Sequence, residues 1–281
     1  MTKHIVAAII LTLITAVAAP SRGADEPAKP AADAAQKPAA PGDSGDAQEA
    51  AARDASPAAA VIDKAAAALG GKDKLAAMKG ATWSSKGTLT LNGADNPFTL
   101  KIVFQGPDRR RVDFDGDFGG TPIKIVAVVN ADKGWRRFGD STEELAADQL
   151  DTERRNGYRE WAAVNVLALK SAPFKAEAAG ETAVDGKPAT GVKVTTPAGA
   201  PFTIYFDKES GLPVKQVATA RTFDGGEATE ETTYSNYKDF GGVKKATKIE
   251  VKHDGQKLVE AEVTEFKVTD GAEAGAFDKP E

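Results

Sequence analysis

The chain lacks most of the side chains that covalent catalysis and metal binding use. Its 281 residues contain no cysteine and two histidines, His4 and His253. The absence of cysteine excludes disulfides, thiol nucleophiles and thiolate metal sites. Nucleophilic triads and metal clusters usually need histidine as well, and only His253 lies beyond the first residues. We therefore expect no enzyme activity, no catalytic residue, no metal site and no cofactor.

Two features that resemble reactive sites have simpler interpretations. His253 lies late in a polar, alternating stretch, which is typical of a solvated residue at the end of a hairpin. The acidic residues in 113–117 have the spacing of oxygen ligands, but a calcium loop needs glycine at its sixth position and glutamate at its twelfth. Phe118 and Lys124 occupy these positions. We interpret the acidic run as the flank of a hairpin turn.

The chain is weakly acidic. Its 36 Lys and Arg against 41 Asp and Glu give a formal net charge of −5, which argues against nucleic acid as a partner. The densest basic cluster is Arg109, Arg110 and Arg111. In an alternating strand these side chains point to opposite faces. We interpret the cluster as a solvated strand edge in preference to an anion site.

Residues 1–23 have the layout of a secretory signal peptide. Lys3 supplies the charged start, residues 5–17 form a short apolar core, and small residues follow it. The apolar run is shorter than the roughly 20 residues that a membrane-spanning helix needs. We expect a cleaved signal and a soluble protein that is periplasmic or otherwise extracytoplasmic. An uncleaved anchor is the alternative.

Residues 24–56 form a compositionally distinct segment. They are rich in Ala, Pro, Asp and Lys and contain no aromatic residue, so they bury too little apolar surface to offset the entropy of ordering. We expect a disordered linker. Residues 57–281 remain, about 220 residues, which is enough for one large β domain that folds without disulfides.

Local patterns predict helices in two regions. Residues 58–69 are Ala-rich with apolar side chains at helical spacing, and residues 72–78 form a second short piece. Ser141–Glu144 has the sequence of a capping box, so we expect a helical stretch from there to about Lys170. Asn156-Gly157 is expected to split that stretch into two helices.

Elsewhere the apolar residues recur with the period of two that is typical of β-strands. Turn signals such as Asp185-Gly186, Ser210-Gly211 and Asp254-Gly255 recur between Pro173 and Val268. We count about eleven strands, which are too many for a flat open sheet. The predicted fold is mainly β (α+β): a curved antiparallel sheet of about eleven strands, or half-open barrel, with helices covering the concave side.

Alternation places most of the large apolar side chains on the concave side or under the helices. Periodicity does not distinguish a solid core from a cavity, and a solid core is the more common arrangement. If a cavity is present, we expect its lining to include Trp83, Leu91, Leu100, Ile102, Phe104, Phe114, Trp135, Trp161 and Phe206.

Several segments occur in a recognisable order. Residues 68–80 read Ala-Leu-Gly-Gly-Lys-Asp-Lys-Leu-Ala-Ala-Met-Lys-Gly, and residues 104–113 read Phe-Gln-Gly-Pro-Asp-Arg-Arg-Arg-Val-Asp. Asp-Lys-Gly-Trp follows at 132–135, and Tyr-Phe-Asp-Lys-Glu-Ser-Gly-Leu-Pro-Val-Lys at 205–215. With this order the chain, over about residues 58–268, resembles the LolA/LolB-like outer-membrane lipoprotein-sorting superfamily.

The resemblance implies a half-open antiparallel barrel closed by helices. Its apolar cavity would shield the acyl chains of lipids or lipoproteins in the periplasm. In carriers of this family an arginine on an early strand helps to hold the helical lid shut. Arg110, which shares a strand face with Val112 and Phe114, is the residue at the matching position.

Two functions are compatible with these features. The first is an exported soluble carrier or chaperone that binds acyl chains in an apolar cavity, with a lipid or acylated protein as partner and a membrane-bound protein receiving the cargo. The alternative is a periplasmic protein-interaction or sensor domain on the same fold, without lipid cargo. In both cases we expect a monomer.

Overall fold

The computed structural model describes residues 56–222 and 225–281. The predicted signal peptide, residues 1–23, and the predicted linker as far as residue 55 lie outside the described residues. Within the described ranges, no helix combines the length and the apolar character needed to cross a membrane.

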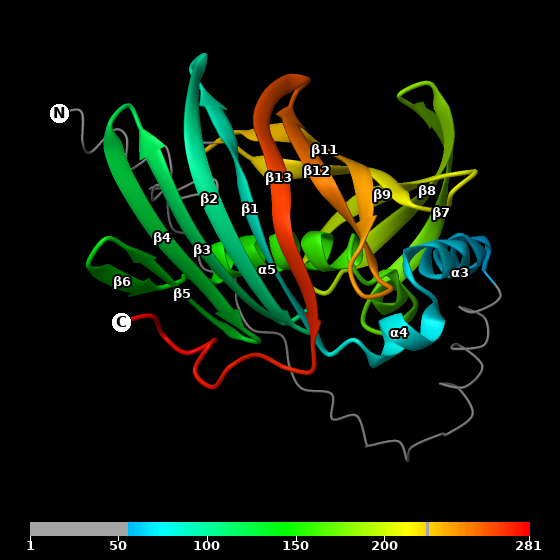
Figure 1. The fold of residues 1–281 in the computed structure, drawn as a ribbon, viewed down its shortest axis with the longest axis horizontal. Helices are drawn as coiled ribbons and strands as arrows, with labels where there is room; N and C mark the ends of the chain where they lie inside the picture. The colour runs from blue at the N-terminus through cyan, green and yellow to red at the C-terminus, as the bar shows by residue number, and fades with distance from the viewer. Residues whose placement is uncertain (1–55, 223–224) are drawn as a thin grey trace, which may run out of the picture.

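Most of the described chain forms one antiparallel sheet, which confirms the mainly β prediction (Figure 1). In the described ranges the sheet has thirteen strands rather than about eleven. They are β1 (Gly80–Leu91), β2 (Ala94–Gln105), β3 (Arg109–Phe118), β4 (Thr121–Asn130), β5 (Lys133–Phe138), β6 (Ser141–Glu144), β7 (Lys175–Val184), β8 (Lys187–Thr196), β9 (Gly199–Asp207), β10 (Pro213–Arg221), β11 (Glu227–Asp239), β12 (Lys244–His253) and β13 (Gln256–Thr269).

The sheet consists of two meanders joined at one place. Strands β1 to β6 pair in sequence order, as do β7 to β13, and β1 pairs with β13 to connect them. The two edges of the sheet are therefore β6 and β7, which follow each other in the chain. No ladder in the described residues joins these edges, so the barrel is open there. The connection between them contains α5 (Ala147–Ala162) and the 3-10 helix η1 (Val166–Lys170).

The two N-terminal helices are found where the sequence predicts them. Helix α3 (Pro57–Leu69) begins after Ser56, whose Oγ accepts a hydrogen bond from Ala59 N–H at 3.1 Å, and has proline at its first position. It ends at Gly70, which has φ of 147° and so favours glycine. Helix α4 (Lys72–Ala77) follows directly.

The helices lie on the concave side of the sheet, as predicted. Helix α5 contacts β4 at one side and β9 at the other, so it crosses the concavity (Figure 1). Helix α3 contacts η1, β7 and β8. The space between helices and sheet holds the main apolar core, which includes Ile62, Leu69, Phe104, Trp161 and Phe206.

The predicted helix boundaries between residues 141 and 170 are wrong. Ser141–Glu144 is strand β6, because its backbone groups pair with β5 instead of starting a helix. Helix α5 begins at Ala147, and the side chain of Gln149 accepts a hydrogen bond from Ala146 N–H at 2.9 Å. Gly157 does not split this helix. A Cβ at Gly157 would lie 3.2 Å from Cδ of Arg110, so glycine lets α5 approach β3 closely.

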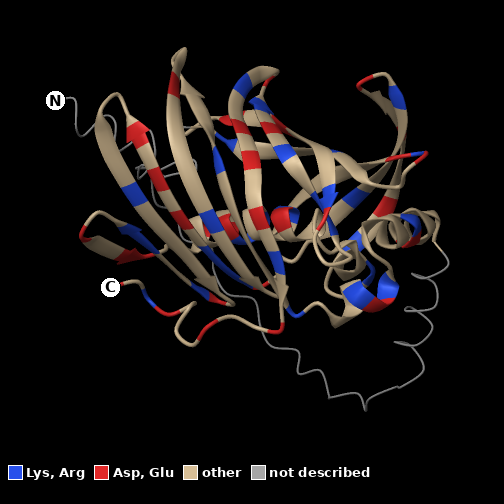
Figure 2. Cartoon of the chain, in the orientation of Figure 1, with Lys and Arg blue, Asp and Glu red and all other residues tan. Residues whose placement is uncertain are grey.

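The C-terminal segment covers part of the outer, convex face of the sheet. Carbonyl oxygens of this segment accept hydrogen bonds from Arg111 on β3, Asn130 on β4 and Thr142 on β6. The side chain of Phe277 is buried. Charged residues of both signs are interspersed along the strands (Figure 2).

Candidate ligand-binding cavity under helix α5

A cavity of about 240 Å³ lies between α5 and the concave face of the sheet. Its apolar wall comes from alternating residues of β1, β2 and β3 on one side and of β11, β12 and β13 on the other. This wall includes Trp83, Phe98, Leu100, Ile102, Val112, Phe114, Ile249, Val251 and Leu258. Helix α5 contributes the polar residues Asn156, Arg159 and Glu160. The cavity therefore has a mainly apolar wall opposite a polar helix.

Seven of the nine predicted lining residues divide into two groups. Trp83, Leu100, Ile102 and Phe114 line the cavity. The other buried residues of the set, Phe104, Trp161 and Phe206, fill a solid core beside it. The ring of Phe104 is 5.4 Å from that of Trp83 and 5.5 Å from that of Trp161. The concave side therefore contains both a packed core and a cavity.

Two residues of the predicted lining lie elsewhere. Leu91 is half-buried at the margin of the core. Trp135 is half-buried on β5, between Gly134 and Arg136, which are both buried. A Cβ at Gly134 would lie 2.8 Å from Leu145, so Gly134 faces the concave side. Strand alternation then directs Trp135 to the outer face, away from the cavity.

Arg110 connects the sheet to helix α5. Its Nε and Nη2 donate hydrogen bonds to the two carboxylate oxygens of Glu160 at 2.8 and 2.6 Å, and its Nη1 donates to Glu153 at 2.9 Å. Burial alone would lower the pKa of Arg110, but Glu160 and Glu153 outweigh it and raise this pKa. The interpretation of the Arg109–Arg111 cluster as a solvated edge is wrong, because β3 lies between β2 and β4.

Glu153 is a buried carboxylate on the inner face of α5. Its side chain is fully buried between Arg110 and Arg136. Burial raises the pKa of Glu153 to about 7, although both arginines act in the opposite direction. Arg136, on β5, is also buried, and its Nη1 is 3.5 Å from Glu143 Oε1. The inner face of α5 is thus attached to the sheet through buried charges.

Lys245, on β12, is a cavity residue that the sequence analysis missed. Only 3% of its surface is exposed, and its Nζ lies 5.0 Å from the centre of the Trp83 ring. Burial lowers the pKa of Lys245 to about 8. A signal was available, since Lys245 has the same strand parity as the inward-facing Ile249 and Val251. Lysine side chains are usually exposed to solvent, so the strand pattern alone did not predict that Lys245 lines the cavity.

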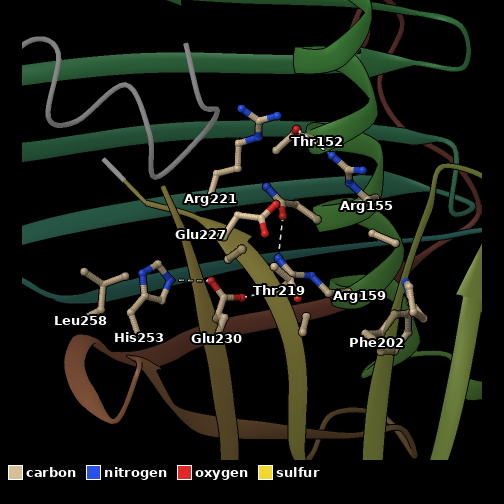
Figure 3. A pocket seen from close by; sticks show the side chains of 15 residues that line it. Thr152, Arg155, Arg159, Phe202, Thr219, Arg221, Glu227, Glu230, His253 and Leu258 are labelled. Carbon is tan, nitrogen blue, oxygen red and sulfur yellow. Dashed lines mark hydrogen bonds and ion pairs between the residues drawn. The ribbon is translucent and has the colours of Figure 1, made fainter. Parts of the chain in front are cut away.

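A second, polar cavity of about 370 Å³ adjoins the first (Figure 3). Asn156, Arg159, Glu230 and Leu258 line both cavities, so these residues separate them. Nη1 of Arg159 is 2.9 Å from Glu230 Oε1. Burial alone would raise the pKa of Glu230, but Arg159 and His253 outweigh it and lower this pKa.

His253 lies in the wall of this second cavity. Its Nε2 is 3.0 Å from Glu230 Oε2, and 17% of its side chain is exposed. The expectation of a solvated histidine is therefore wrong, because the pairing of β12 with β11 places it against the partly buried carboxylate of Glu230. In the described ranges, no group of three or more His, Cys, Asp or Glu residues could hold a metal ion.

Comparisons with known proteins identify the fold. No family model matches the sequence, and no curated protein matches it. Among solved structures, a LolA superfamily protein from Nitrosomonas europaea has a TM-score of 0.53 at 10% identity, over 79% of this chain and 97% of that one. A DUF1329 family protein from Desulfovibrio piger has a TM-score of 0.50 at 12% identity, over 79% and 98%.

A third similar structure is a putative outer membrane lipoprotein-sorting protein domain from Vibrio parahaemolyticus. Its TM-score is 0.49 at 14% identity, over 83% of this chain and 94% of that one. The likenesses with TM-scores of 0.53 and 0.50 agree with the fold of sheet and helices described above. This chain has the fold of the LolA-superfamily structures.

Proposed function

We propose that this protein is a carrier that binds an acyl chain of a lipid or acylated protein in the cavity under α5, outside the cytoplasm. The observation that carries the proposal is the apolar wall of Trp83, Leu100, Ile102 and Phe114 around unfilled space. Burial of each methylene group there would contribute about 0.8 kcal/mol to affinity. Binding of this kind needs no covalent chemistry, no cofactor and no metal.

The size of the cavity implies that α5 moves when cargo enters. Ligand pockets usually have about 300 to 1,000 Å³, whereas this cavity has about 240 Å³. The closed form therefore accommodates one short chain, and a larger acyl group requires α5 to move away from the sheet. Arg110 is the residue that would have to release Glu153 and Glu160. In this proposal α5 is the lid and Arg110 holds it closed.

Filling the cavity tests this proposal. Leu100→Trp adds a large side chain at the apolar wall and should displace part of the ligand. Loss of contact with two methylene groups, at about 0.8 kcal/mol each, would weaken binding by about tenfold. The measurement is competition of decanol with the neutral fluorophore N-phenyl-1-naphthylamine.

Lys101→Trp is the matched control, because Lys101 is the next residue of β2 and is exposed on the other face. It should bind decanol as the wild type does. Equal binding by wild type, Leu100→Trp and Lys101→Trp would contradict the location of the site. Absence of any binding to the wild-type protein would contradict the carrier function itself.

A protein-binding function on the same fold has one feature in its favour. Strand β7 is an edge of the sheet and is exposed along most of its length, so a partner strand could pair with it. However, the β7 ladder is interrupted between Ala178 and Glu181, and such irregularities usually prevent strand addition. Native mass spectrometry of protein from a bacterial periplasm separates the two functions by the presence or absence of a bound lipid.

A further inference from the structure

The cavity contains a buried ammonium group whose positive charge is not matched by a contacting carboxylate. Lys245 is 3% exposed and lines the cavity. Within the part of the chain that the structure describes, its Nζ has no hydrogen bond and no ion pair. Among the described residues, it lies 5.0 Å from the centre of the Trp83 ring, and Glu160 acts on it electrostatically without contact. A buried cation that contacts only an aromatic ring is costly to the folded state.

The carboxylates that line the cavity are already engaged with other cations. Both oxygens of Glu160 accept hydrogen bonds from Arg110. One oxygen of Glu230 is paired with Arg159, and the other lies 3.0 Å from His253 Nε2. Among the described lining residues, three cations thus face two carboxylates, and the third cation is Lys245. Lys245, over the ring of Trp83, is therefore the lining cation that contacts no carboxylate of the described residues.

We propose that Lys245 binds the anionic headgroup of the ligand, so that the cargo of this cavity is an amphiphile with a single negative charge, such as a long-chain carboxylate. This inference rests on the proposed function, and it specifies the class of ligand. The ligand carboxylate would form the ion pair that Lys245 lacks, while the acyl chain lies along Leu100, Ile102 and Phe114. Tyr234 lines the same cavity, and burial raises its pKa, so its hydroxyl remains a donor.

The arrangement also distinguishes a binding role from a structural one. A lysine that stabilises the fold is expected to hold a carboxylate or a carbonyl group, as Lys170 holds Asp63. Lys245 holds neither in the described residues. Because burial disfavours its charged form, replacing Lys245 by an apolar residue should not destabilise the protein. A substitution that weakens ligand binding without lowering stability is typical of a residue that functions in binding.

Comparison of two ligands tests the proposal on the wild-type protein. Decanoic acid and decanol have the same chain, and at pH 7 the acid is ionised and Lys245, with a pKa of about 8, is protonated. Each ligand competes with N-phenyl-1-naphthylamine. We expect the affinity for decanoate to be at least about tenfold higher than that for decanol, because the carboxylate can form a charge-assisted hydrogen bond with Lys245.

Two variants locate the effect. Lys245→Met should remove the preference for decanoate, leave the affinity for decanol within about twofold, and keep or raise the unfolding midpoint. Lys244→Met is the matched control, because Lys244 is adjacent on β12 and exposed. It should retain the preference for decanoate.

The outcomes separate this inference from the proposed function. If wild type binds decanoate and decanol equally, the headgroup assignment is wrong and the carrier function stands. If Lys245→Met keeps the preference for decanoate, another cation binds the headgroup. If the wild-type protein binds neither ligand, the carrier function fails and the headgroup inference fails with it. The wild-type comparison does not depend on the folding of any variant.

Discussion

Buried charges beneath α5 are the main feature at the scale of single residues. Arg110, Arg136, Glu153 and Lys245 are all buried, although charged side chains are seldom buried without a partner. Arg110 has two carboxylate partners, whereas Glu153 has its second oxygen, Oε1, buried without a hydrogen bond in the described residues. Such groups reduce the stability of the closed form, and this lowers the free energy needed to move α5 away from the sheet.

Glu153 should make the stability of the protein depend on pH. Its pKa is about 7 in the folded protein, whereas an unburied glutamate has a pKa of 4.5. Between these values the folded state holds a proton that the unfolded chain has lost, so stability falls as pH rises from 4.5 to 7. The loss is at most about 3 to 4 kcal/mol, since the two pKa values differ by about 2.5 and a difference of one corresponds to about 1.4 kcal/mol.

Urea unfolding of wild type and Glu153→Gln at pH 5 and pH 8 measures this loss. The free energy of unfolding of the wild type, relative to Glu153→Gln, should be lower at pH 8 than at pH 5. Glu143→Gln is the control, because Glu143 lies near the same Arg136 but is 57% exposed. Parallel pH profiles of wild type and Glu153→Gln would show that Glu153 titrates normally.

At the scale of elements, α5 is a helix attached through charges. Its buried face consists of Glu153, Gly157, Tyr158, Trp161 and Ala162, so apolar contacts are concentrated in its last turns. Arg110, on β3, binds Glu153 in the first half of the helix and Glu160 in its last turn, so the first half is attached mainly through one ion pair. We therefore expect the N-terminal half of α5 to separate from the sheet more readily than the C-terminal half.

Loosening this attachment should accelerate ligand exchange. The double variant Arg110→Met/Glu153→Gln removes the ion pairs without leaving a buried carboxylate alone, which would itself destabilise the protein. We expect the dissociation rate of N-phenyl-1-naphthylamine, measured by stopped-flow fluorescence, to rise by about tenfold, equivalent to about 1.4 kcal/mol.

Arg111→Met is the control for this experiment. Arg111 is adjacent to Arg110 on β3 but pairs with Asp113 and the C-terminal segment on the outer face. N-phenyl-1-naphthylamine should dissociate from Arg111→Met at the wild-type rate. If the double variant also exchanges ligand at the wild-type rate, Arg110 does not hold α5 closed.

At the scale of the whole molecule, the two faces of the curved sheet are covered by different parts of the chain. The concave face holds the helices and the cavity, while the convex face is partly covered by the C-terminal segment through Arg111, Asn130 and Thr142. Phe277 is buried on that outer side. The two faces should therefore contribute separately to binding and to stability.

The same substitution on each face tests this separation. Phe277→Ala should lower the free energy of unfolding by about 3 to 5 kcal/mol, as for other buried phenylalanines, and leave decanol binding unchanged. Phe114→Ala, on the concave face of β3, should lower both stability and affinity. Unfolding in urea and fluorophore competition are measured on both variants. A loss of affinity in Phe277→Ala would show that the two faces are coupled.

Much of the local structure was predictable because it depends on neighbouring residues. Helix α3 has an Ala-rich sequence, a serine cap and a terminal glycine, and all three act within one or two turns. Hairpins follow from turn residues such as Asp185 and Asp254, both with positive φ in the structure. The resemblance to the LolA/LolB-like superfamily predicted the half-open sheet correctly, and the structural comparison confirms that fold.

The errors in prediction came from interactions between distant segments. Ser141–Glu144 has the sequence of a helix cap but pairs with β5, and Gly157 lies within α5, close to the side chain of Arg110 on β3. Trp135 faces outward because β5 is aligned by its pairing with β4. These outcomes depend on which element lies alongside, and local propensity does not contain that information.

The sequence by itself determined the class of fold, the positions of the first helices and the apolar faces of the strands, because periodicity and turn residues act locally. Tertiary structure alone decided which aromatic side chains fill a core and which line a cavity. It also decided that Arg110 faces two glutamates and that Lys245 faces Trp83. The physical reason is that burial and charge pairing join residues far apart in the chain, and only the curvature of the sheet brings them together.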